Sequence, residues 1–122
     1  MEKKKILVID DEIGFTELVK LNLEATGNYV VKIENDGTKA FQTIQAFLPD
    51  LILLDIIMPN IEGPDVVNKM RNSNFKHIPI IFLTATVTKA EVEAQEGKIG
   101  GHEFLAKPST VKELVDCIER HL

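Results

Sequence analysis

Residues 51–55 read Leu51-Ile52-Leu53-Leu54-Asp55, and residues 6–11 read Ile6-Leu7-Val8-Ile9-Asp10-Asp11. Each stretch is a run of four aliphatic residues that ends in a carboxylate. An apolar run without alternating polar residues is typical of a strand that is buried on both faces of a parallel sheet. The two stretches therefore predict a parallel sheet covered by helices on both faces, with acidic side chains at the ends of two strands.

Asp10, Asp11 and Asp55 would repel one another if these two strands were neighbours. Adjacent strands lie about 5 Å apart, and two unit charges at that distance repel by about 3 kcal/mol at an effective dielectric constant of about 20. A fold that brings the carboxylates together therefore needs a cation. Carboxylates and water suit Mg²⁺, or Mn²⁺ as a substitute, whereas zinc usually requires Cys and His ligands.

The composition predicts one folded, soluble domain over residues 1–122. The chain is 44% hydrophobic and 27% charged, with a formal net charge of −5. The negative charge disfavours direct binding to nucleic acid or to an anionic membrane. The one cysteine excludes an internal disulfide, and the first aliphatic run is too short for a signal peptide, so we expect a cytoplasmic protein.

Apolar runs alternate with helical patterns five times along the chain, which indicates βα units. The expected strands cover residues 5–9, 29–34, 51–54, 78–83 and 103–106. The second is mixed in polarity and the fifth is short, so we expect these two at the edges. Right-handed crossovers then favour a doubly wound sheet of order 2-1-3-4-5, with a crevice where the chain reverses direction between strands 1 and 3.

The helices are predicted from apolar stripes and from end signals. The stripes consist of Phe15, Leu18, Val19 and Leu23 in the first helix, Ala40, Phe41, Ile44, Phe47 and Leu48 in the second, and Val111, Leu114, Val115 and Ile118 in the last. The first helix is expected to stop near Gly27, the third to open at Gly63-Pro64, and the last to begin with a Thr110/Glu113 capping box.

A fourth helix is predicted after a capping box formed by Thr88 and Glu91. Its stripe is weak, because the only residues that could face a core are Ala90, Val92, Ala94 and Ile99. We therefore expect this helix to be held less firmly than the others and to be the part of the domain that moves.

Two further polar residues, Thr84 and Lys107, end or follow the fourth and fifth expected strands. A hydroxyl and an ammonium group opposite a metal ion suit a phosphoryl group, because its oxygens carry negative charge. An aspartate can accept a phosphoryl group as an acyl phosphate. Asp55, at the end of the most buried central strand, is the best-placed nucleophile.

In order and approximate spacing, the chain resembles the receiver domains of two-component response regulators, from about Lys4 to His121. The matching segments are Asp10-Asp11, Asp55-Ile56-Ile57-Met58-Pro59 with Gly63, Thr84-Ala85, and Lys107-Pro108 after Phe104-Leu105. The resemblance implies the flavodoxin-like (βα)5 fold of CheY-like proteins and a phosphorylation-dependent regulator rather than an enzyme.

The resemblance also implies how phosphorylation would act. Asp55 would receive the phosphoryl group from a sensor histidine kinase or a histidine phosphotransfer protein, and Lys107 would pair with the phosphoryl oxygens. Thr84 would turn inward to hydrogen-bond them, and Phe104 would follow into the vacated space. The surface of the fourth helix, fifth strand and fifth helix would then bind a downstream protein target or output domain.

For the metal, the resemblance implies that Asp11, Asp55 and the backbone carbonyl of Ile57 bind Mg²⁺, and that Asp10 acts mostly through water. Ile57 and Thr86 stand two residues beyond Asp55 and Thr84. We expect these two residues to flank the path of a water that attacks the acyl phosphate, so that a bulky apolar Ile57 slows autodephosphorylation.

Three other functions are compatible with this fold class. A haloacid-dehalogenase-type phosphatase needs a second acid two residues after its nucleophile, but Ile57 occupies that place. A flavin-binding electron carrier needs a Ser/Thr/Gly phosphate loop after the first strand, where this chain has Asp10-Asp11-Glu12. A binding module that is never phosphorylated would be favoured if one of the five polar groups of the site were missing. The sequence contains all five, which are Asp10, Asp11, Asp55, Thr84 and Lys107.

Overall fold

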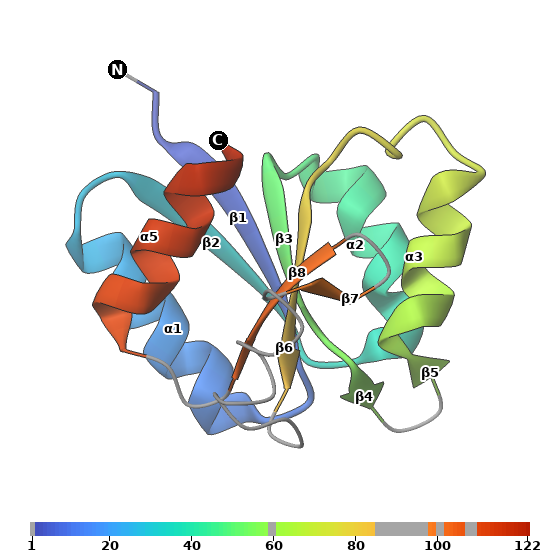
Figure 1. Ribbon diagram of the computed structural model, residues 1–122, viewed down its shortest axis with the longest axis horizontal. Helices are drawn as coiled ribbons and strands as arrows, with labels where there is room; N and C mark the ends of the chain where they lie inside the picture. The colour runs from blue at the N-terminus through green and yellow to red at the C-terminus, as the bar shows by residue number, and fades with distance from the viewer. Residues whose placement is uncertain (1, 59–60, 85–97, 100–101, 107–109) are drawn as a thin grey trace.

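The computed structural model of the chain describes residues 2–58, 61–84, 98–99, 102–106 and 110–122. A central sheet lies between two pairs of helices, with α1 and α5 on one face and α2 and α3 on the other (Figure 1). The helices are α1 (Ile13–Ala25), a short 3-10 helix η1 (Gly37–Lys39), α2 (Ala40–Phe47), α3 (Gly63–Arg71) and α5 (Val111–His121).

The sheet has the strand order β2-β1-β3-β6-β8-β7. Its strands are β1 (Lys4–Ile9), β2 (Tyr29–Glu34), β3 (Leu51–Asp55), β6 (Ile80–Thr84), β7 (Lys98–Ile99) and β8 (His102–Ala106). The first five in this order pair in parallel, and β7 pairs antiparallel with β8. The predicted parallel α/β fold is confirmed, with β6 and β8 in the fourth and fifth places.

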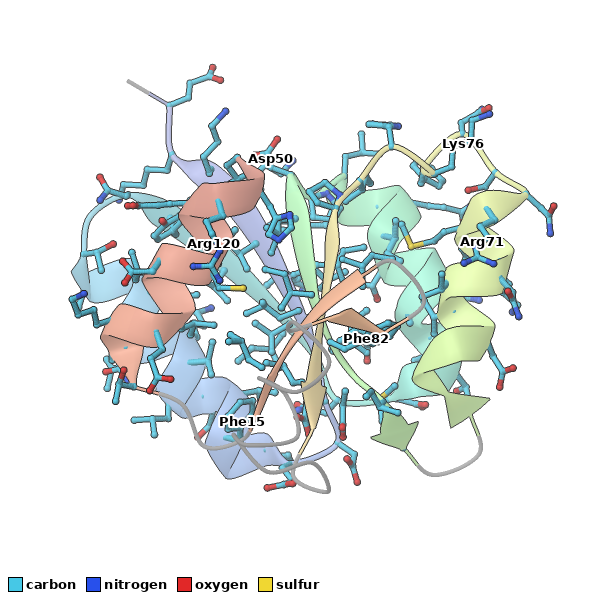
Figure 2. All side chains as sticks on the ribbon, viewed as in Figure 1. Phe15, Asp50, Arg71, Lys76, Phe82 and Arg120 are labelled. Atoms are coloured by element: carbon cyan, nitrogen blue, oxygen red, sulfur yellow. The ribbon has the colours of Figure 1, made fainter. Side chains whose placement is uncertain are left out.

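Alternate residues of the central strands point to opposite faces of the sheet and build two cores. On β3, Leu51 and Leu53 join the core under α1 and α5, whereas Ile52 and Leu54 join the core under α2 and α3. All four side chains are completely buried. Figure 2 shows the same division with Phe15 and Phe82, which lie on opposite sides of the sheet. This two-sided burial explains why the strand sequence is aliphatic without alternation.

The side of the sheet where the strands begin is fixed by hydrogen bonds between β1 and the turn before β3. The backbone N–H of Lys5 donates to Oδ2 of Asp50 at 2.8 Å, and the backbone N–H of Asp50 donates to the carbonyl of Lys5 at 2.8 Å. The Lys5 ammonium lies 4.9 Å from the centre of the Phe47 ring. The C-terminus lies at this side of the molecule, near the labelled Asp50, and β1 also begins at this side (Figures 1 and 2).

Several local predictions are wrong. The fourth strand begins at Ile80, because Pro79 has no N–H for the ladder. Ile99 belongs to strand β7 and not to a helix. A second, two-stranded antiparallel sheet, which we did not predict, pairs β4 (Ile57–Met58) with β5 (Ile61–Glu62).

Three residues of the predicted apolar stripes are exposed. Leu18 is 55% exposed because the buried face of α1 is formed by Thr16, Val19 and Leu23 at i, i+3 and i+7. Leu48 is 55% exposed because it follows α2 in a left-handed conformation, φ 53°, and leaves the line of the stripe. Val111 lies in the first turn of α5 and is 38% exposed.

The predicted helix ends agree better with the structure. The Thr110/Glu113 capping box is present, with the Thr110 hydroxyl accepting from the Glu113 N–H at 3.1 Å and the Thr110 N–H donating to Oε1 of Glu113 at 3.2 Å. Gly27 follows α1 with a positive φ of 82°, which favours glycine. Among the described residues, no helix is both long and apolar enough to cross a membrane. The helix predicted after Thr88 lies outside them.

Candidate functional site

The register of β1 and β3 sets two of the three aspartates side by side. Ile9 is paired with Leu54, so the next residues along the two strands are Asp10 and Asp55. Asp55 is also paired with Leu83 on β6, which makes β3 the strand in the middle of the site. The hydrophobic ladder thus determines where the acidic groups lie, as the sequence predicts.

Asp10, Asp11 and Asp55 form one cluster at the side of the sheet where β1 and β3 end. Each offers a carboxylate oxygen, and these oxygens all lie within 4.8 Å of one another. Asp10 is completely buried, Asp55 is 7% exposed, and Asp11 is exposed. Burial of like charges this close is costly unless a cation or hydrogen bonds compensate. Three carboxylate oxygens with one side open to water match the ligands that Mg²⁺ prefers, so the residues fit this ion.

Hydrogen bonds hold Asp10 at three of its atoms. Its Oδ1 accepts from the backbone N–H of Glu12 at 2.9 Å, which shapes the turn into α1. Its backbone N–H donates to the carbonyl of Glu34 at 3.1 Å, and its carbonyl accepts from Nδ2 of Asn35 at 2.8 Å. Asp10 therefore has the local turn-forming role that an acid at a strand end often has, and it lies in the acidic cluster as well.

Asn35 contacts Asp10 of the site, and Thr16 contacts Asn35. The sequence predicted neither contact. Nδ2 of Asn35 donates to Oγ1 of Thr16 at 2.9 Å, and Oγ1 of Thr16 donates to the carbonyl of Ile13 at 3.0 Å. Thr16 is completely buried. A hydroxyl on the buried face of a helix needs a partner, and that is the one sequence signal that could have led to this contact.

The short segment after β2 is held by its own hydrogen bonds. Asp36 caps η1, with Oδ1 accepting from the hydroxyl of Thr38 at 2.6 Å and from its N–H at 3.0 Å. These two bonds, the hydroxyl first, lower the pKa of the exposed Asp36 carboxyl. The Asp36 N–H donates to Oε2 of Glu34 at 3.1 Å. The segment that carries Asn35 is thus locally constrained.

The other predicted site residues are described in part or not at all. The backbone of Thr84 ends β6 opposite Ala106, and the backbone of Phe104 pairs with Phe82. Ile57 lies in β4, two residues beyond Asp55. Lys107 and Thr86 lie outside the described residues.

A groove of about 500 Å³ lies elsewhere on the surface, between β2 and α2. It is lined by Lys32, Ile33, Glu34, Lys39, Gln42, Thr43, Ala46 and Phe47. None of the three aspartates is among them. The clustered carboxylates, and not this open groove, therefore define the candidate site.

Comparison with known proteins agrees with this fold and this cluster. The chain matches the response regulator receiver domain family over residues 6–119 and belongs to that family. Receiver domains are the phosphoacceptor domains of two-component signalling, and they are regulators. The resemblance inferred from the sequence is confirmed.

Individual relatives and structures support the same assignment. The chain is 34% identical, over 99% of its length, to the response regulator Rre1 of Synechocystis, and 35% identical, over 91%, to the alkaline phosphatase synthesis transcriptional regulatory protein PhoP of Bacillus subtilis. It covers 52% and 45% of those proteins, so it spans about half their length. The chemotaxis protein CheY4 of Vibrio cholerae superposes with a TM-score of 0.83 at 31% identity, covering 99% of this chain and 100% of that one.

Proposed function

We propose that Asp55 is the phosphoacceptor of this receiver domain and that residues 1–122 form one phosphorylation-controlled signalling unit. The observation that carries the proposal is the convergence of three carboxylates, within 4.8 Å, at the ends of β1 and β3. Asp55 is the member of the cluster on the central strand, almost buried yet not completely so. An aspartate carboxylate can act as the nucleophile that accepts a phosphoryl group.

The reaction is a phosphoryl transfer from a phosphohistidine of a sensor kinase or phosphotransfer protein. A carboxylate oxygen of Asp55 forms the new P–O bond while the P–N bond to the histidine breaks, and the histidine nitrogen leaves with the electron pair. Asp10, Asp11, Asp55 and the backbone carbonyl of Ile57 would hold Mg²⁺, or Mn²⁺ in its place. The bound ion would supply positive charge for the phosphoryl oxygens.

Three further residues complete the proposed switch. Lys107 pairs with the phosphoryl oxygens, Thr84 hydrogen-bonds them, and Phe104 follows Thr84. The segment between β6 and β8, together with β8 and α5, then presents the altered surface to a protein partner or an output domain. Residues 1–122 act through this protein partner and do not themselves bind nucleic acid or a membrane. The signalling takes place in the cytoplasm.

The test is incubation with a small phosphodonor and Mg²⁺, followed by intact-mass measurement. The wild type should gain the mass of one phosphoryl group, and Asp55→Asn should gain none. Asp116→Asn is the matched control, because Asp116 is an exposed carboxylate paired with Lys112 at 3.3 Å on α5, and it should be modified like the wild type. Phosphorylation of Asp55→Asn, or an unmodified wild type, would contradict the proposal.

A second prediction concerns the lifetime of the phosphorylated state. Ile57→Asn should lose its phosphoryl group about tenfold faster than the wild type, a barrier lower by about 1.4 kcal/mol. The reason is that a polar side chain two residues from Asp55 can guide the attacking water that isoleucine excludes. Loss of the added mass is followed over time after removal of the donor. Val30→Asn, on the exposed side of β2, is the control; an equal or slower rate for Ile57→Asn counts against the idea.

A further inference from the structure

We propose that Asn35 is a positioning residue that fixes the peptide joining Asp10 to Asp11 and thereby sets the geometry of the metal site. The contact that carries this is the 2.8 Å hydrogen bond from Nδ2 of Asn35 to the Asp10 carbonyl. That carbonyl belongs to the peptide unit between the two aspartates. Rotation of this unit would swing the Asp11 side chain relative to Asp10 and Asp55. The inference rests on the proposed metal site of the previous section.

Asp11 depends on this peptide more than its neighbours do. Its side chain is exposed, and no hydrogen bond or ion pair from the described part of the chain holds it. Asp10, in contrast, is anchored through its carboxylate and its N–H. The backbone of Asp11 must therefore be oriented from outside for its carboxylate to stay within 4.8 Å of the other two.

The amide nitrogen of Asn35 is fixed by two hydrogen bonds. The Asp10 carbonyl can only accept, so the nitrogen of the amide must face it. The same nitrogen donates to Thr16 Oγ1 at 2.9 Å, and Thr16 is completely buried on α1. The backbone after Asn35 is held by the Asp36 N–H bond to Oε2 of Glu34 and by the Asp36 cap of η1. The backbone before it is held by the Glu34 carbonyl, which accepts from the Asp10 N–H. Asn35 therefore connects the end of β2, the start of α1 and the acidic pair.

Outer hydrogen-bond partners of this kind orient the groups that bind a metal, and their loss typically weakens metal affinity about tenfold or more. Asn35→Ala should therefore raise the dissociation constant for Mg²⁺ about tenfold, measured by isothermal titration calorimetry of the metal alone without a phosphodonor. Asn72→Ala is the matched control, because the Asn72 amide also donates to a backbone carbonyl, at 3.2 Å, but on the exposed end of α3. Its affinity for Mg²⁺ should equal that of the wild type.

Variants of Thr16 provide a second test, because Thr16 contacts Asn35 and not the peptide between Asp10 and Asp11. Thr16→Val removes the hydroxyl that orients Asn35, so it should weaken Mg²⁺ binding by a smaller factor than Asn35→Ala does. Thr16→Ser keeps the hydroxyl and should bind Mg²⁺ as tightly as the wild type. In the Asn35→Ala background, Thr16→Val should have no further effect on Mg²⁺ affinity, since the two residues act through one contact. A purely structural role would lower stability without this pattern.

The outcomes separate the inference from the proposed function. A wild type that gives no Mg²⁺ titration overturns both. A wild type that binds Mg²⁺ while folded Asn35→Ala binds it equally well overturns this inference alone. If Asn35→Ala does not fold, wild-type affinity in Thr16→Val has the same meaning.

Discussion

Asp10→Asn should be more stable than the wild type in magnesium-free buffer, by about 2 kcal/mol in the free energy of unfolding. Asp10 is completely buried, with two other carboxylate oxygens within 4.8 Å. The substitution removes that repulsion. The Asn side chain keeps an oxygen that can accept from the Glu12 N–H, so the turn into α1 need not be lost.

The measurement is urea unfolding with EDTA and with excess Mg²⁺. The slope of the transition should be unchanged, so that a shifted midpoint reports stability. Mg²⁺ at about 100 times its dissociation constant would stabilise the wild type by about 2.7 kcal/mol, and Asp10→Asn should gain less. Asp116→Asn, which removes an exposed carboxylate on α5, should stay within about 0.5 kcal/mol of the wild type. A less stable Asp10→Asn in EDTA would show that the repulsion is already compensated.

Leu53→Ala should destabilise the protein by about 3 kcal/mol, because it leaves a cavity in the middle of the sheet. Leu53 is completely buried on β3, paired with Val8 on one side and Ile81 on the other. Domains of this size are commonly stable by about 5–15 kcal/mol, so the loss is a large share of the total.

Leu21→Ala tests whether burial, and not the loss of a leucine, causes that effect. Leu21 is 67% exposed on α1, and alanine is at least as good a helix former. Urea unfolding should place Leu21→Ala within about 0.5 kcal/mol of the wild type. Similar losses for the two variants would mean that the core under α1 and α5 is not packed as described.

The central strands and the acidic cluster could be predicted because both depend on periodicity. Four aliphatic residues followed by aspartate indicate a strand buried on both faces, and the pairing of Ile9 with Leu54 follows once the two runs are neighbours. The order of the strands followed from which runs are apolar and which are mixed. The convergence of Asp10, Asp11 and Asp55 was therefore available from the sequence.

Other features depend on contacts that leave no pattern in the sequence. Leu18 repeats the spacing of a buried residue, but the packing of α1 against the sheet is rotated toward Thr16 and exposes it. The β4–β5 pair is too short to have a period. Asn35 reaches Asp10 across 25 positions, and an asparagine after an edge strand looks like an ordinary turn residue. Such side-chain to backbone contacts need the fold before they can be identified.

The position of the chain ends has a practical consequence. Residues 2 and 122 emerge on the side where the strands begin, and the three aspartates lie where β1 and β3 finish (Figure 1). A biotin tag or a fused fluorescent protein at either end would therefore extend away from the acidic cluster. A biosensor chip that captures the molecule by such a tag would leave the carboxylates accessible to a kinase flowing past.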